Sequence, residues 1–180
     1  MKPLTSTLIL SLAFASFGFG ADDDTAALIA AVAKSKHTLV SGVPALVKSP
    51  EIAISAKFEF DDDHKLSLSV YSAEKGLAAD AEHNILKEYS ADPLAATLAP
   101  KAEVFKDVEH VSRSAAQLAI TSLAKITLVD AISKAEKSTQ GQALSVTPAV
   151  ANGKGGFSVT VIKEGKPMVV TVGLDGEISK

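Results

Sequence analysis

The chain has 180 residues, is 47% hydrophobic and carries a formal net charge of −3. It contains no cysteine, which excludes disulfides, a catalytic thiolate and lipid attachment at a cysteine of this chain. The mildly acidic balance argues against nucleic acid, which is recognised by a basic stripe, and against a polybasic membrane patch.

Residues 1–20 have the parts of a secretory signal peptide. A lysine precedes an apolar segment, residues 8–19, that is too short to cross a bilayer as a stable helix. Gly18 and Gly20 are small residues at the −3 and −1 positions, so we expect cleavage before Ala21. The sequence therefore predicts an exported protein, periplasmic or extracellular, with no stable membrane anchor after cleavage. An uncleaved anchor is the alternative.

Residues 21–90 begin with the acidic run Asp22-Asp23-Asp24 and an alanine-rich helix. The run favours a helix start, because carboxylates there complement the helix dipole. A divalent-cation site is the rival interpretation, but adjacent carboxylates lack the alternate spacing of a calcium loop. Gly42 and Pro44 are expected to interrupt the helical pattern that follows, leaving a short helical turn before Pro50.

Residues 52–71 predict an antiparallel hairpin with one apolar and one polar face. The apolar residues of its first strand alternate strictly: Ile52, Ile54, Ala56, Phe58 and Phe60. Those of the returning strand are Leu66, Leu68 and Val70. A third strand is expected within residues 84–89.

Residues 91–126 are interpreted as a linker and a connecting helix. Pro93 and Pro100 indicate an irregular crossing, and Asp107 can cap the helix. The expected apolar face of this helix carries Val108, Val111, Ala115, Leu118 and Ser122, with Glu109, His110 and Arg113 outside. We expect the helix to pack between two sheets and to end before Thr127.

Residues 127–180 read as a complete unit of one capped helix and three alternating strands. Thr127 and Asp130 have the spacing of a capping box, and Gly141 is the expected helix stop. The predicted buried stripe of the helix is Leu128, Ala131, Ile132, Ala135 and Thr139.

The strands of this unit are separated by glycine turns at residues 152–156 and Glu164-Gly165. Pro148 is expected to place its strand at an edge or to end it, because proline cannot donate to a ladder. Residues 174–176 form a last turn before Ile178.

This order of elements resembles the PepSY domain. The residues that carry the resemblance are 128–137, Gly141, Phe157-Ser158-Val159-Thr160-Val161 and Val170-Thr171-Val172. The closing segment, residues 173–178, is shorter than in the family and lacks its threonine. The resemblance implies a role in restraining peptidases in the cell envelope or its surroundings. In relatives with such a domain in a protease pro-region a catalytic domain follows, and none follows in this sequence, so we expect the target to be a separate chain.

Residues 21–90 repeat the same order more loosely, and Thr38-Leu39-Val40 echoes Thr127-Leu128-Val129. We therefore predict an α+β fold, with small antiparallel sheets each covered by an amphipathic helix and two PepSY-like modules in tandem. The first module, residues 21–90, is degenerate, and residues 127–180 form the second. The alternative is that the strands of residues 21–90 extend the same sheet as those of residues 127–180.

No catalytic pattern is present: there is no G-x-S-x-G, H-E-x-x-H or phosphate-binding glycine loop. The densest potential ligand cluster is Asp61-Asp62-Asp63-His64, which is also a typical solvated hairpin turn. The other histidines, His37, His83 and His110, are not spaced as a ligand pair, and Glu82 and Glu109 merely adjoin two of them in sequence. Tyr71 and Tyr89 fit either a binding surface or a sheet margin.

We assign no catalytic, cofactor-binding or metal-binding residue and expect no cofactor. The favoured hypothesis is a non-enzymatic exported binding or regulatory protein that pairs a sheet edge with a protease loop or an extended peptide. An envelope sensor of a ligand or metal, contacted through the acidic hairpin tip, is the alternative.

Overall fold

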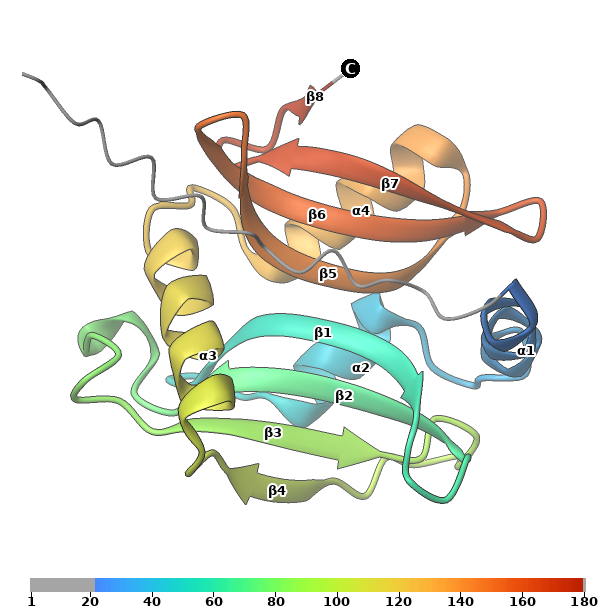
Figure 1. Ribbon diagram of the computed structural model, residues 1–180, viewed down its shortest axis with the longest axis horizontal. Coiled ribbons are helices and arrows are strands. Elements are labelled where there is room, and N and C mark those ends of the chain that lie inside the picture. The colour runs from blue at the N-terminus through green and yellow to red at the C-terminus, as the bar shows by residue number, and fades with distance from the viewer. Residues whose placement is uncertain (1–21, 180) are drawn as a thin grey trace, which may run out of the picture.

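A computed structural model describes residues 22–179 of the chain (Figure 1). The predicted signal peptide, residues 1–20, lies outside the described residues. The helices are α1 (Asp22–Val32), α2 (Leu39–Leu46), α3 (Val108–Thr121) and α4 (Leu128–Thr139), with a short 3₁₀ turn at Gly76–Ala78. The strands are β1 (Ile52–Phe60), β2 (Leu66–Ala73), β3 (Leu86–Ala91), β4 (Lys101–Val104), β5 (Gln142–Ala151), β6 (Lys154–Lys163), β7 (Lys166–Gly173) and β8 (Ile178–Ser179). None of the helices within residues 22–179 is both long and apolar enough to cross a membrane.

All the described strands belong to one antiparallel sheet with the order β4-β3-β2-β1-β5-β6-β7-β8. The α+β class predicted from the sequence is confirmed. Each half of the sheet has the same order of elements, since α2 precedes β1 to β4 and α4 precedes β5 to β8. The strands of the two halves join edge to edge, so both extend one sheet rather than forming two.

The two halves meet where β1 pairs with β5, through only two residue pairs. Ala56 lies opposite Val146, and Lys57 lies opposite Ser145. Ala56 and Val146 hold corresponding places, because each lies three residues beyond the last regular pair before a β-bulge in its own strand. The seam therefore has an approximate two-fold axis that passes between these two residues.

The bulge in β1 changes which face its first residues occupy. The pairing with β2 shifts between Ala53 and Ser55, which leaves Ile54 as the extra residue. Ala56 and Phe58 enter the main core as predicted, but Ile54 packs in a second cluster with Tyr71 and Leu118. Ile52 packs against the same second cluster, so the strict alternation expected from Ile52 to Phe60 is wrong at both isoleucines, because an extra residue resets the side-chain period.

Helices α2 and α4 cover one face of the sheet, and α3 crosses the other face (Figure 1). The main core lies under α2 and α4, with Val32 of α1 at its margin. The predicted stripe of α4 is confirmed, since all its members are buried: Leu128, Ala131, Ile132, Ala135 and Thr139.

The ends of α4 are set by two different devices. The predicted capping box is confirmed: Asp130 N–H donates to the Thr127 hydroxyl, and Thr127 N–H donates to the Asp130 carboxylate. The helix ends at Thr139, and Gln140 takes the left-handed conformation, with φ of 58°. The predicted stop at Gly141 is wrong by one residue. A Cβ on Gly141 would lie 2.6 Å from the Ile162 carbonyl oxygen, so that glycine permits close packing instead.

Helix α2 includes both residues that were expected to interrupt it. It begins at a capping box formed by Thr38 and Ser41 and continues through Gly42 and Pro44. A Cβ on Gly42 would lie 2.3 Å from Leu68 Cδ2, so the glycine brings α2 into contact with β2. The expected interruption is wrong because the cap and this burial outweigh the local preferences of glycine and proline.

Helix α3 starts at its predicted Asp107 cap but buries a different face from the one expected. Its buried residues are Ser114, Gln117, Leu118 and Thr121. Val108 is 84% exposed and Val111 is 38% exposed, so the predicted apolar stripe is wrong at both. Three of these buried residues are polar, so apolar periodicity did not mark the contact. Helix α3 lies on one sheet and not between two.

Three further details of the chain path differ from expectation. The glycine-rich segment after β5 is a two-residue turn, Asn152-Gly153 with φ of 51° and 73°, and the glycines that follow belong to β6. Pro148 lies in an internal strand, but the pairing of β5 with β1 stops at Val146, so no ladder bond is lost. The predicted linker contains β4, a fully exposed strand of four residues, which is too short for its alternation to stand out.

Candidate functional site: the open edge of strand β7

The outer edge of β7 is unpaired over most of its length. Strand β8 pairs with Thr171 and Val172. From Lys166 to Val170, the outer edge has no strand partner among the described residues. An unpaired edge is a template on which another extended chain can add.

The direction of the backbone groups along this edge follows from the antiparallel alternation. Gly173 N–H donates to the Glu177 carbonyl oxygen at 2.7 Å, so Gly173 faces outward. The register between β6 and β7 has no shift, so every second residue before it faces outward too, including Val169 and Pro167. The free edge thus offers the N–H and C=O of Val169 and the C=O of Pro167. Proline costs no internal bond there, since its missing donor faces away from β6.

Apolar side chains line this edge. Val169 is 62% exposed and Met168 is 41% exposed. The next residues toward β8 anchor the strand, because Val170 and Val172 are buried in the main core beneath α4. The exposed segment is therefore held by a rigid support, as preorganised binding requires.

The opposite edge of the sheet is less suited to pairing. Strand β4 has only four residues, all exposed, and two of them are the charged Lys101 and Glu103. Charged side chains on short edge strands discourage further pairing. Strand β7 is the longer and more apolar of the two edges.

Two lysines flank the far end of the β7 edge. Lys163 and Lys166 lie directly opposite each other across the two-residue turn Glu164-Gly165, which confirms the predicted hairpin. Both lysines are exposed, and within residues 22–179 neither forms an ion pair. Like charges at facing positions destabilise a sheet slightly, so an anion beside them would be favoured.

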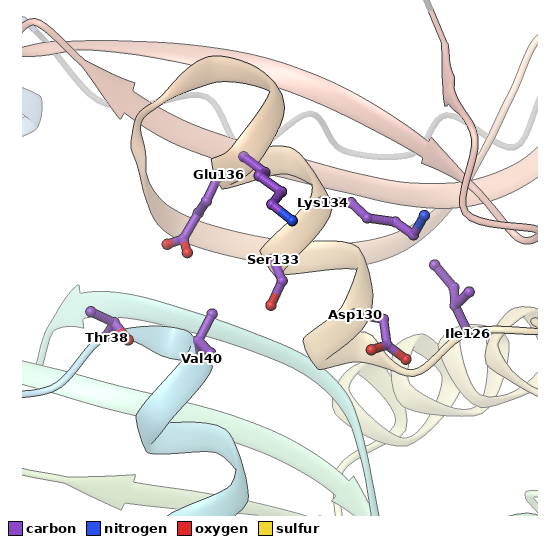
Figure 2. A pocket seen from close by; sticks show the side chains of 8 residues that line it. Thr38, Val40, Ile126, Asp130, Ser133, Lys134 and Glu136 are labelled. Carbon is purple, nitrogen blue, oxygen red and sulfur yellow. The ribbon is translucent and has the colours of Figure 1, made fainter.

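A groove on the helical face lies between α2 and α4 (Figure 2). Its volume is about 820 Å³, and its lining residues are Thr38, Val40, Ile126, Asp130, Ser133, Lys134, Glu136 and Lys137. The acidic side chains there already have structural partners. Asp130 accepts from the α4 cap, and Glu136 Oε1 accepts from Ala143 N–H at 2.8 Å. The acidic side chains of the groove therefore support α4 and β5.

Two acidic side chains at the hairpin tip, residues 61–64, are bonded within the turn itself. Asp61 Oδ1 accepts from the backbone N–H groups of Asp63 and Lys65, and Lys65 Nζ pairs with Asp63 at 3.1 Å. His64 takes a left-handed conformation with φ of 55° in the turn. Across residues 22–179, no three His, Asp or Glu side chains converge as metal ligands would.

The remaining histidines are each held by neighbours rather than gathered. His83 and His110 bond to Asp80 and Asp107, three residues earlier, and not to the glutamates beside them in sequence. His37 Nε2 lies 3.1 Å from the Ala95 carbonyl oxygen. These side chains lie on different parts of the fold and form no common site.

The aromatic residues considered for a binding surface are structural. Tyr71 is buried and meets Phe105 edge to face at 5.0 Å, and Phe105 stacks on His110. Burial and the nearby carboxylate of Glu88 raise the pKa of Tyr71 well above its ordinary value. The expectation that His110 points outside is wrong, since it joins this cluster at the start of α3.

Sequence reasoning missed a polar network around Glu51. Its carboxylate accepts from Ser72 at 2.6 Å and from Tyr89 at 3.0 Å, and lies 3.4 Å from Lys87 Nζ. Burial lowers the pKa of Lys87, but its bonds to Glu74 and Tyr89 and the charge of Glu51 outweigh this and raise it. The network joins the residue before β1 to β2 and β3.

Pairing at a sheet edge was proposed from the sequence, but the β7 edge was not identified as the exposed one, although a signal existed. Val169 interrupts the polar positions of β7 with a large apolar residue, two residues after a proline. An apolar side chain at a polar position next to an edge marker is the pattern that could have indicated it.

Comparisons with known proteins add a likeness and no family. No family model matches the chain, and no curated protein matches it. Among solved structures, the chain is similar to a predicted lipoprotein of Clostridium difficile 630, with 16% identity and a TM-score of 0.37. The match covers 72% of this chain and 80% of that one.

Proposed function

We propose that the protein is an exported, non-enzymatic binding protein that captures an extended peptide or a protease loop at the free edge of β7. The observation that carries this proposal is the unpaired segment from Lys166 to Val170, with Met168 and Val169 exposed on a firmly anchored strand. Main-chain hydrogen bonds supply affinity in such pairing, and alternate side chains supply selectivity. The signal-like residues 1–20 and the resemblance to PepSY domains support export and a role in restraining peptidases.

The edge can be tested by placing a charge on it. Val169→Lys should abolish capture of short valine- and threonine-rich peptides, measured by fluorescence anisotropy, because a charged edge residue opposes strand addition. The substitution should leave the fold intact, since the side chain is 62% exposed. Leu123→Lys, at a residue that is 72% exposed and lies beyond α3, is the matched control and should bind like the parent protein.

The peptide backbone supplies a second control. N-methylation of the peptide at the residue facing Val169 should weaken binding, because it removes a main-chain donor. The same protein preparations should slow cleavage of unfolded substrates by secreted peptidases. Failure to bind any extended peptide, together with no effect on any such peptidase, would refute the proposal.

A further inference from the structure

We infer that the β7 edge selects an extended segment that runs antiparallel to β7. The segment has apolar residues at two adjacent positions, one residue of any type after them, and then a carboxylate. This inference rests on the proposed function and names the chemistry of its partner. It follows from the register, the facing side chains and the two lysines at the turn, Lys163 and Lys166, which form no ion pair within residues 22–179.

The direction of the partner is set by β8. Strand β8 runs antiparallel to β7 and ends its pairing at Ser179, opposite Thr171. A segment entering the open part of the edge in the same direction continues that ladder without a change of pattern. Antiparallel pairing is also slightly more stable per residue than parallel pairing.

The register then assigns one side chain to each position. The partner residue opposite Val169 exchanges backbone bonds with it and shares its face of the sheet. The next partner residue lies beside Met168, on the face of the sheet that α2 and α4 cover. Both neighbours are exposed and apolar, at 62% and 41%, so apolar partner residues bury area there.

Two positions farther along, the partner residue lies opposite Lys166. Cross-strand neighbours share a face, so this side chain points to the same side as Lys166 and Lys163. A carboxylate here relieves the repulsion between two facing ammonium groups that have no ion pair within residues 22–179. A glutamate, an aspartate or a free carboxyl terminus supplies the same chemistry.

Three synthetic peptides that differ at this one position test the inference. Each carries valine at the two apolar positions and threonine elsewhere, with glutamate, glutamine or lysine opposite Lys166. At low ionic strength the glutamate peptide should bind about two- to five-fold more tightly than the glutamine peptide, as exposed ion pairs allow. The lysine peptide should bind more weakly than either, and added salt should reduce the differences.

Variants of the protein assign the effect to the turn. In Lys166→Gln combined with Lys163→Gln, the glutamate and glutamine peptides should bind equally, because the charges that distinguish them are gone. Equal binding of all three peptides to the parent protein, still lost in Val169→Lys, would overturn this inference and leave the proposed function standing. Absence of binding by every peptide would overturn this inference, and the proposed function would fall with it if no secreted peptidase were slowed either.

Sedimentation of the protein alone distinguishes a second copy as the occupant. The inference expects a mass that does not change with concentration. A dimer that forms with rising concentration and is lost in Val169→Lys would overturn it, because two β7 edges would then be pairing with each other.

Discussion

Two buried threonines provide a test of the energetics of this fold, because the same substitution should have opposite effects at each. Thr121 of α3 is 8% exposed, and its hydroxyl is buried without a hydrogen-bond partner in the described residues. Thr139 of α4 is 7% exposed, and its hydroxyl donates to the Ala135 carbonyl at 2.8 Å and accepts from Gly141 N–H at 3.1 Å. Valine replaces threonine with nearly the same shape and helix propensity.

The two contexts set the expected sizes. An unsatisfied buried hydroxyl costs about 1–3 kcal/mol, so Thr121→Val should raise the free energy of unfolding by about 1 kcal/mol. At Thr139 the substitution leaves the Gly141 N–H without its acceptor, so Thr139→Val should lower the free energy of unfolding by about 1–2 kcal/mol.

Urea unfolding followed by far-ultraviolet circular dichroism measures both changes, since the chain has no tryptophan to report by fluorescence. Equal slopes with shifted midpoints would show that stability has changed and not the size of the unfolding unit. Destabilisation by Thr121→Val of the size seen for Thr139→Val would refute the reasoning, because it would mean that the α3 hydroxyl has a stabilising partner.

Three other substitutions test the packing, the buried ion pair and the helix cap. Gly42→Ala should lower the free energy of unfolding by about 1–3 kcal/mol in urea titrations, because its Cβ would meet the fully buried Leu68. Glu51→Gln should lower the free energy of unfolding by about 1–3 kcal/mol, because it weakens the interaction with Lys87, whose side chain is 12% exposed. A double-mutant cycle with Lys87→Met should show coupling between the two residues, and additive effects would contradict this. Hydrogen bonds from Thr127, the N-cap residue of α4, hold the pKa of Asp130 below its ordinary 3.8. The cap therefore contributes its full stabilisation above pH 3.8, and this stabilisation is lost as the pH falls through the lowered pKa. Asp130→Asn should therefore reduce the acid-induced loss of stability in unfolding curves at pH 2–5, and an unchanged pH profile would contradict the assignment.

The sequence was most informative about features that depend only on neighbouring residues, such as the buried and exposed faces of one helix. The α4 stripe and its capping box were predicted residue by residue, because a 3.6-residue period and a two-residue cap are local properties. The hairpin at Glu164-Gly165 was predicted for the same reason, since a two-residue turn with left-handed backbone needs glycine.

The features that could not be predicted depend on contacts between distant segments. The bulge at Ile54 changes the side-chain period within β1, and Ser114 is a polar residue buried in α3, so neither leaves a periodic apolar trace. The open edge at Val169 depends on where β8 stops, which pattern reading at residues 178–179 does not determine. The α+β class could therefore be predicted from local pattern, whereas the sequence suggested pairing at a sheet edge without showing which edge is open.

The narrow seam between the halves has a consequence for any fragment of this chain. Cutting after α3 would bare the backbone of β5 around Val146, which is covered in the intact protein by Ala56. Because those two residues occupy equivalent places, we expect the detached carboxy-terminal half to find its substitute in an identical copy of itself. The intact chain thus has the arrangement of a homodimer whose two subunits are joined in one polypeptide.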